Sequence, residues 1–107
     1  MSAIASPSKS ERWAALAIHP DDDVAVALRD LAAGETVAIR QAAAVVSAVA
    51  REAIPMGHKM ALRAVPSGAP IRKYGQPIGT ATVDIAAGAH VHVHNVASRR
   101  ARARKIT

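Results

Sequence analysis

Three segments of this chain repeat one spacing of small, aliphatic and glycine residues, and this spacing restricts the fold more than any other feature. Each segment has Ala first, an aliphatic residue fifth, Gly eighth and another aliphatic residue eleventh. The segments are Ala27–Val37, Ala61–Ile71 and Ala81–Val91. Glycine can adopt the positive φ of a tight turn, and the flanking aliphatic residues anchor a short strand on each side. The repetition predicts a compact, mostly all-β domain with short connecting turns.

One stretch, residues 40–52, fits a helix or a strand equally well. It is rich in alanine, so its local propensity is helical. However, Val45, Val46 and Val49 are β-branched, and Pro55 ends the run. The residues of this stretch alone leave both structures open.

The composition allows one small domain whose core is poor in aromatic side chains. The chain has 107 residues, no Phe and no Cys, and its aromatic residues are Trp13 and Tyr74. A core of Val, Ile, Leu and Ala buries little area per residue, so we expect a partner surface to contribute to stability. Disulfides and thiolate chemistry are excluded. We expect a cytoplasmic protein, since the sequence contains neither a membrane-spanning apolar run nor a signal-peptide pattern.

Positive charge is concentrated near the C-terminal end. The net charge is +6, and five of the 14 basic residues lie within residues 99–105, which leaves nine basic against eight acidic residues. A basic tail can attract nucleic acid, but no aromatic platform accompanies this one, so we expect no nucleic-acid partner. We predict a flexible segment over residues 1–17, a folded domain over residues 18–96 and a disordered tail over residues 97–107.

Histidine and valine alternate from His90 to His94. Strand side chains repeat with a period of two, so a strand here would place His90, His92 and His94 on one face. Neutral imidazole binds divalent metals and titrates near physiological pH, which makes such a face a candidate ligand surface. The alternative is that these histidines are structural and form hydrogen bonds within the fold.

Polar residues near the predicted turns form a second group of candidates. Pro55 and Gly57 predict a bend that presents His58 and Lys59, either for carboxylate binding and proton transfer or as a solvated turn. Three consecutive acids, residues 21–23, are interpreted as turn and cap chemistry. The candidate substrate-binding residues are His58, Lys59, Arg63, Lys73, Tyr74 and Asn95. Arg63 could clamp a carboxylate with two hydrogen bonds, and an ordinary surface ion pair is the alternative.

Four motifs follow one another in a fixed order along the chain. They are His19–Leu28, Ile54–Arg63, Lys73–Thr82 and Gly88–Asn95, the last with the pattern Gly-x-x-Val-His-Val-His-Asn. Together they resemble the N-terminal SAF domain of the altronate and galactarate dehydratase family over roughly residues 18–96. The resemblance implies a β-clip fold, and it favours strand and loop over helix for residues 40–52.

The resemblance also implies a chemistry and a set of site residues. The family reaction removes water from a 2,3-dihydroxy acid to give a 2-keto acid, which requires a base, an acid and a cation that stabilises the developing negative charge. His92, His94 and Asn95 occupy motif positions, whereas His90 falls where members of the family vary. We therefore expect His92 and His94 to be catalytic and to ligate a metal, with His90 as a less favoured ligand. The expected metal is iron(II) or manganese(II), held by these histidines or mainly by a partner subunit.

A partner is implied as well, because in many members this domain is fused to a much larger catalytic region. The chain stops at Thr107, so we expect a stand-alone small subunit that is inactive alone and works with a separate large dehydratase subunit. The similar sulfolactate sulfo-lyase has this organisation, so either water or sulfite could be the leaving group. The expected substrate is a small anionic hydroxy acid, and homo-oligomers remain open. The alternative function is a non-catalytic SAF-type module that binds a ligand or a partner.

Overall fold

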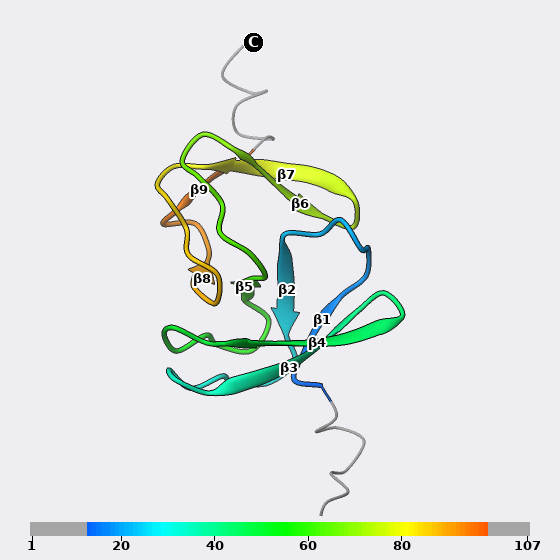
Figure 1. Cartoon of the computed structure of the whole chain (residues 1–107). Coiled ribbons are helices and arrows are strands. Elements are labelled where there is room, and N and C mark those ends of the chain that lie inside the picture. The colour runs from blue at the N-terminus through cyan, green and yellow to red at the C-terminus, as the bar shows by residue number, and fades with distance from the viewer. Residues whose placement is uncertain (1–12, 99–107) are drawn as a thin grey trace, which may run out of the picture.

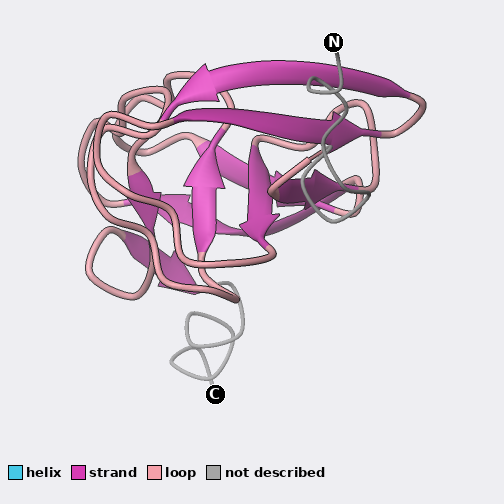
Figure 2. Cartoon of the chain, turned by 90° about the horizontal axis from the view of Figure 1, so that it is seen from below, coloured by secondary structure: helices cyan, strands magenta, loops and turns pink. Residues whose placement is uncertain are grey.

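The computed structural model describes residues 13–98, and within that range every regular element is a strand. The strands are β1 (Ala15–Ala17), β2 (Val24–Ala27), β3 (Thr36–Gln41), β4 (Ala44–Val49), β5 (Lys59–Ala61), β6 (Pro70–Lys73), β7 (Gln76–Ala81), β8 (His90–Val91) and β9 (Val96–Ser98). Figure 2 shows strands joined by loops. The prediction of an all-β domain is confirmed.

The strands form two sheets. The larger sheet has the order β4-β3-β1-β2-β5-β8, and the smaller has the order β6-β7-β9. Neighbouring strands pair antiparallel except β1 and β3, which are parallel. In Figure 1 the small sheet lies at the top and the β3–β4 hairpin at the bottom, with β2, β5 and β8 between them. The part of the chain that the structure describes contains no helix that could span a membrane.

The folded region extends beyond the predicted bounds at both ends. Strand β1 begins at Ala15, and Ala14, Ala15 and Ala17 are buried in the core, although we expected residues 1–17 to be flexible. Strand β9 continues to Ser98, past the predicted boundary at residue 96. The rest of the predicted flexible segment and the basic part of the predicted tail, residues 1–12 and 99–107, lie outside the described residues.

Residues 40–52 form strand and loop, as the family resemblance implied. They complete β3 and supply β4, and the two strands pair in register from Thr36↔Val49 to Gln41↔Ala44. Ala42 closes the hairpin with a φ of 54°, which is a turn conformation and not a helical one. The helical propensity of the alanines is overridden because β3 pairs with β1 on one side and with β4 on the other.

The repeated sequence spacing corresponds to a loop conformation that occurs four times within residues 13–98. The fourth copy, Ala50–Met60, was not recognised from the sequence because its eleventh residue is Met. In every copy the glycine has a φ of 86° or 87°. The first, fifth and eleventh side chains of each copy are buried. Each loop therefore contributes three side chains to the core and uses its glycine to reverse the chain.

The four loops associate in two pairs through reciprocal backbone hydrogen bonds. Leu31 and Ile54 form one bridge, with N–H···O distances of 2.8 and 2.9 Å, and Val65 and Ile85 form the other, with both distances at 2.8 Å. The amide of each loop glycine donates to the carbonyl of the first residue in the paired loop, at 2.7 or 2.8 Å. One pair contributes to a core cluster that contains Leu31 and Ile54, and the other to a cluster that contains Val65 and Ile85.

Aspartates stabilise these turns. Asp30 Oδ1 accepts the amide of Met56, and Asp84 Oδ1 accepts the amide of Ser67, both at 2.8 Å, so an aspartate of one loop caps the turn of its partner. Asp22 is buried and accepts the amides of His19 and Gly75. This agrees with the interpretation of the acidic run as turn chemistry.

The loop glycines differ in how much space surrounds them, which gives a matched test of this architecture. A Cβ at Gly88 would lie 2.0 Å from the carbonyl oxygen of Val49, whereas a Cβ at Gly68 would meet nothing within 4 Å. We expect Gly68→Ala to cost about 1–2 kcal/mol, from the left-handed backbone alone. Gly88→Ala should cost a further ~1–3 kcal/mol, because backbone must move to relieve the overlap. Urea denaturation of both variants measures the difference, and equal losses would contradict the close contact at Gly88.

Candidate functional site

Four histidines gather at one place on the domain surface. The ring of His58 lies 4.0 Å from that of His92 and 5.0 Å from that of His90, measured between centroids. His58 Nδ1 and His90 Nε2 are 2.8 Å apart and share a hydrogen bond. The ring of His94 lies 5.2 Å from that of His90. The side chains of His58, His90 and His92 are partly buried, whereas His94 is exposed.

The pairing of β5 with β8 brings these residues together from distant parts of the chain. The two strands are antiparallel, with Lys59 opposite Val91 and Met60 opposite His90. One further step of this register places His58 opposite His92. Residues that lie opposite each other on neighbouring strands share a face of the sheet, so the two imidazoles meet. Met60 is fully buried on that same face, so the histidines lie above the core.

The predicted strand from His90 to His94 is wrong beyond Val91. Strand β8 ends there, and residues 92–95 form a turn in which the Asn95 amide donates to the His92 carbonyl at 3.1 Å. The turn keeps His92 near His90 but directs the chain outward at His94. The alternation predicted one strand face for His90, His92 and His94. His94 does not share such a face with the other two histidines.

Asn95 explains why the strand ends. Its side chain is buried, Oδ1 accepts the amide of His92 at 3.0 Å, and Nδ2 donates to the carbonyl of His90 at 2.9 Å. A side-chain amide that satisfies local backbone groups competes with strand pairing. We expected Asn95 to contact the substrate, but its amide is instead engaged by the backbone that carries His90 and His92. Asn95 is thus a positioning residue for these two histidines.

The surroundings of His90 and His92 favour the neutral imidazole. The pKa of His90 is lowered by burial first and then by the neighbouring His58 and His94, and the negative charge of Glu52 only partly opposes this. The pKa of His92 is lowered by loss of solvent and by the positive charges of His58 and Lys59. The neutral form, which binds metals and accepts protons, is therefore favoured at neutral pH.

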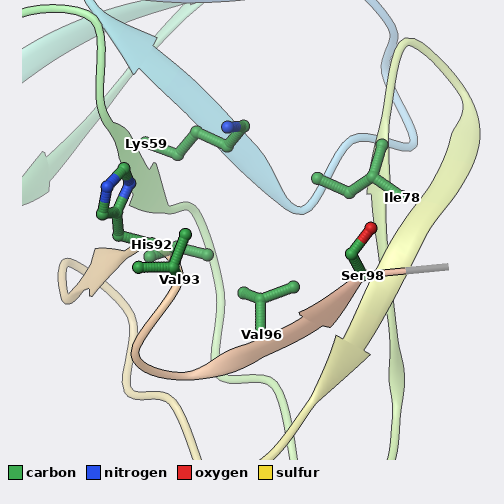
Figure 3. A pocket seen from close by; sticks show the side chains of 7 residues that line it. Lys59, Ile78, His92, Val93, Val96 and Ser98 are labelled. Atoms are coloured by element: carbon green, nitrogen blue, oxygen red, sulfur yellow. The ribbon is translucent and has the colours of Figure 1, made fainter. Parts of the chain in front are cut away.

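A pocket of about 220 Å³ adjoins the cluster and shares His92 with it. It lies where β5 and β8 of the large sheet approach β7 and β9 of the small sheet, and Figure 3 shows Lys59 and His92 across from Ile78, Val96 and Ser98. The pKa of Lys59 is lowered by partial burial and by the nearby positive charge of Lys73. A cation beside apolar walls suits a small anion with a carbon chain.

The structure separates the remaining predicted residues from this pocket. Arg63 forms an ion pair with Asp23, at 3.0 Å between Nε and Oδ1, which is the surface pairing that we weighed as the alternative. Tyr74 is exposed in the β6–β7 turn with a φ of 57°, and Lys73 Nζ lies 4.7 Å from the centre of its ring. Lys73 acts on the pocket only through its charge near Lys59.

The sequence reasoning missed the apolar side of the pocket and one proximity in the cluster. Ile78 and Val96 are partly buried and pack against a core cluster, and Ser98 is exposed, so none of the three carries a local sign of a site. His58 was a candidate for substrate binding, but its contact with His90 depends on strand pairing across 32 positions. Only the register of β5 against β8 could have revealed it.

The fold and the site define a small all-β domain with a histidine cluster beside a pocket that contains Lys59. The chain matches the altronate/galactarate dehydratase SAF domain over residues 13–99, and it belongs to that family. Altronate dehydratase of Escherichia coli (strain K12) is 48% identical over 78 residues, which are 73% of this chain. The chain spans 15% of the length of that relative. The resemblance inferred from the sequence motifs is therefore confirmed.

The lowered pKa values of His90 and His92 predict a loss of stability on acidification. At pH values between the depressed pKa values and the ordinary histidine pKa, the unfolded chain binds more protons than the folded one. The free energy of unfolding should therefore fall as the pH drops from about 7.5 to about 5. Urea denaturation with a chelator present measures the slope. The double variant His90→Asn, His92→Asn should show a smaller slope, and an unchanged slope would contradict the prediction.

Replacement of Asn95 by alanine tests its positioning role. Asn95→Ala leaves the His92 amide and the His90 carbonyl without their side-chain partner, so we expect a loss of about 1–3 kcal/mol in the free energy of unfolding. The NMR signals of the His90 and His92 rings should also shift. His94→Ala, in the same turn but exposed, should change stability by less than about 0.5 kcal/mol. Equal losses for the two variants would refute the role of Asn95.

Proposed function

We propose that this domain is the small-subunit component of a hydro-lyase that dehydrates a sugar acid, or a related hydroxy acid, to a 2-keto acid in the cytoplasm. Membership of the altronate/galactarate dehydratase SAF family supports the reaction class. The single observation that supports a direct role of this chain is the pocket in which Lys59 and His92 lie together. A pocket that combines an ammonium group with an imidazole suits an anionic polyol.

Two residues of the pocket have distinct tasks in this proposal. Lys59 binds the substrate carboxylate, and Lys73 adds positive potential nearby, since the two ammonium groups already repel each other in the absence of an anion. His92 is neutral at working pH and exchanges a proton with the substrate. In the reaction, the proton next to the carboxylate is removed and the hydroxyl on the neighbouring carbon leaves as water. The resulting enol then rearranges to the 2-keto acid.

The small size of the pocket supports the proposal that a partner subunit completes it. Pockets for small ligands typically enclose about 300–1,000 Å³, and this one has about 220 Å³. A sugar acid would be only partly enclosed by this domain. We therefore propose that a separate large subunit covers the pocket, supplies further catalytic groups and is required for turnover.

Replacement of Lys59 tests the proposal. We would co-express the chain with a large dehydratase subunit from the same genome and measure 2-keto acid formation from a panel of sugar acids. Lys59→Met should lower kcat/KM by about 10–100-fold, chiefly through KM, because one charge-assisted hydrogen bond to the carboxylate is lost. Arg40→Met is the control. Arg40 belongs to β3 and lies over the ring of Trp13, away from the pocket.

Each outcome of the assay decides between the two functions that we considered. Turnover that depends on Lys59 supports the hydro-lyase. Acid binding by the domain without turnover in the reconstituted complex would refute the hydro-lyase and favour a non-catalytic binding module. If Lys59→Met leaves turnover unchanged, this pocket takes no part in the reaction.

A further inference from the structure

We propose that strand β4 is a self-association surface, to which a second copy of this chain adds its own β4 antiparallel to form a symmetric dimer. Strand β4 is the terminal strand of the large sheet and pairs with β3 on one side. Within residues 13–98 no strand pairs with its other side. The backbone along such an edge is a template for a further strand. This inference does not depend on the proposed function.

The backbone directions in β3 determine which groups of β4 face the open edge. The carbonyl of Ala38 accepts an amide from the β1 side, and backbone groups of successive strand residues point to opposite sides. Ile39 therefore points its backbone groups toward β4, where its register partner is Val46. It follows that the N–H and C=O groups of Val45 and Ser47, on either side of Val46, point away from β3 and toward the open edge.

A second copy can use these groups in one symmetric register. When Val46 lies opposite Val46 of the second copy, Val45 lies opposite Ser47 of that copy and Ser47 lies opposite its Val45. Each of these pairs can exchange both N–H···O hydrogen bonds, so every outward group of Val45 and Ser47 finds a partner. The edge closes beyond this point, because the carbonyl oxygen of Val49 already lies against Gly88. The pairing is therefore centred on Val46.

The side chains of β4 suit contact with an identical strand. All its residues are uncharged, so no charge meets its own copy in the symmetric pairing. Val45 and Val46 are 60% and 40% exposed, and pairing would remove this apolar surface from water. Val46 lies opposite the fully buried Ile39, and Ala48 on the same face packs against the core cluster. Pairing of two β4 strands therefore continues the core of one copy into that of the other.

The other sheet edges in the described part of the chain carry features that discourage pairing. Strand β8 has two residues and β9 has three. Strand β6 begins with Pro70, ends in two cationic residues and has a shift of register after Ile71. Short strands, proline, charges and bulges are the features by which proteins protect a sheet edge. Strand β4 has six residues and none of these features, so it is the edge left open to a partner strand.

The proposed dimer leaves the candidate pocket to another partner. No residue of β4 lines the pocket, and β4 and β8 are at opposite ends of the strand order of the large sheet. In Figure 1 the hairpin that contains β4 lies at the bottom, away from β7 and β9, which border the pocket. Two copies joined through β4 can therefore each present a pocket to a large subunit.

The mass of the full chain as a function of its concentration measures this dimer. One strand from each copy is a small contact, at or below the low end of the roughly 1,200–2,000 Å² that stable interfaces bury. We therefore expect a reversible dimer with a Kd of about 10–100 μM. Sedimentation equilibrium at concentrations that span this range should show a shift from the mass of one chain to twice that mass.

Two exposed valines provide a matched pair of variants. Val45→Lys places an ammonium group on the edge of each copy and should raise the dimer Kd by at least about 10-fold. Val83→Lys is the control, because Val83 is similarly exposed, at 53%, but lies in a loop outside β4. It should change the Kd by less than about 3-fold. Ser47→Pro removes an N–H that points away from β3, so it should abolish the dimer without a loss of β3–β4 hydrogen bonds.

A cysteine at the centre of the pairing tests the register in a folded chain that is otherwise free of cysteine. In the proposed dimer, Val46 and its copy form a non-hydrogen-bonded pair, whose Cα atoms lie about 4.5 Å apart. This distance is within the range that a disulfide spans. Oxidised glutathione should therefore link Val46→Cys into a covalent dimer much faster than it links Val83→Cys. Equal rates for the two variants would overturn the register.

The remaining outcomes distinguish a second copy from other occupants of the edge. A chain that sediments as a monomer at every concentration would overturn the proposal. In that case, loss of co-purification of a large dehydratase subunit with Val45→Lys would assign β4 to the large subunit instead. Neither result decides the hydro-lyase proposal, because the assay of Lys59→Met tests the pocket and not the edge of β4.

Discussion

The paired glycine loops are the constraint on which the rest of this structure depends. The core contains alanine at many positions and no aromatic side chain among its fully buried members, so each side chain contributes little buried area. The loops compensate because each buries three side chains and directs its hydrogen bonds to its partner. The two bridges, Leu31–Ile54 and Val65–Ile85, each satisfy both backbone groups of the residues at their centres. A chain of small residues thereby forms two core clusters.

The same loops build the functional site. Two of them, Ala50–Met60 and Ala81–Val91, end in β5 and β8, which pair with each other. These strands carry Lys59 and His90, and His58 directly precedes β5. These loops belong to different pairs, and Gly88 joins them because its carbonyl accepts the amide of Arg51 at 2.9 Å. Gly88 can approach so closely only without a Cβ. The packing of the two loop pairs therefore determines how far apart the histidines lie.

The sequence alone predicted the features that depend on interactions within one short segment. The glycine spacing predicted the turns, the short strands and the all-β class, and the motifs identified the family. The end of β8 at Val91 was missed because one buried side chain, Asn95, outweighs the alternation of histidine and valine. The proximity of His58 to His90 was missed because it follows from the pairing register of two strands that are far apart in sequence. Likewise, Ile78 and Val96 look like core residues until the two sheets are placed together.

The charges around the site indicate what completes it. Lys59 lies close to His92 in the pocket, and its positive charge is also near that of Lys73, so positive charge gathers on this side of the site. Among the residues that the structure describes, Glu52 is the carboxylate that acts on His90, and its Oε2 already accepts a backbone amide. An arrangement of this kind favours an anion, because the positive charges of Lys59 and Lys73 attract it. Under the proposed function, a hydroxy acid carries the carboxylate that would pair with Lys59, and its carbon chain would lie against the apolar side of the pocket.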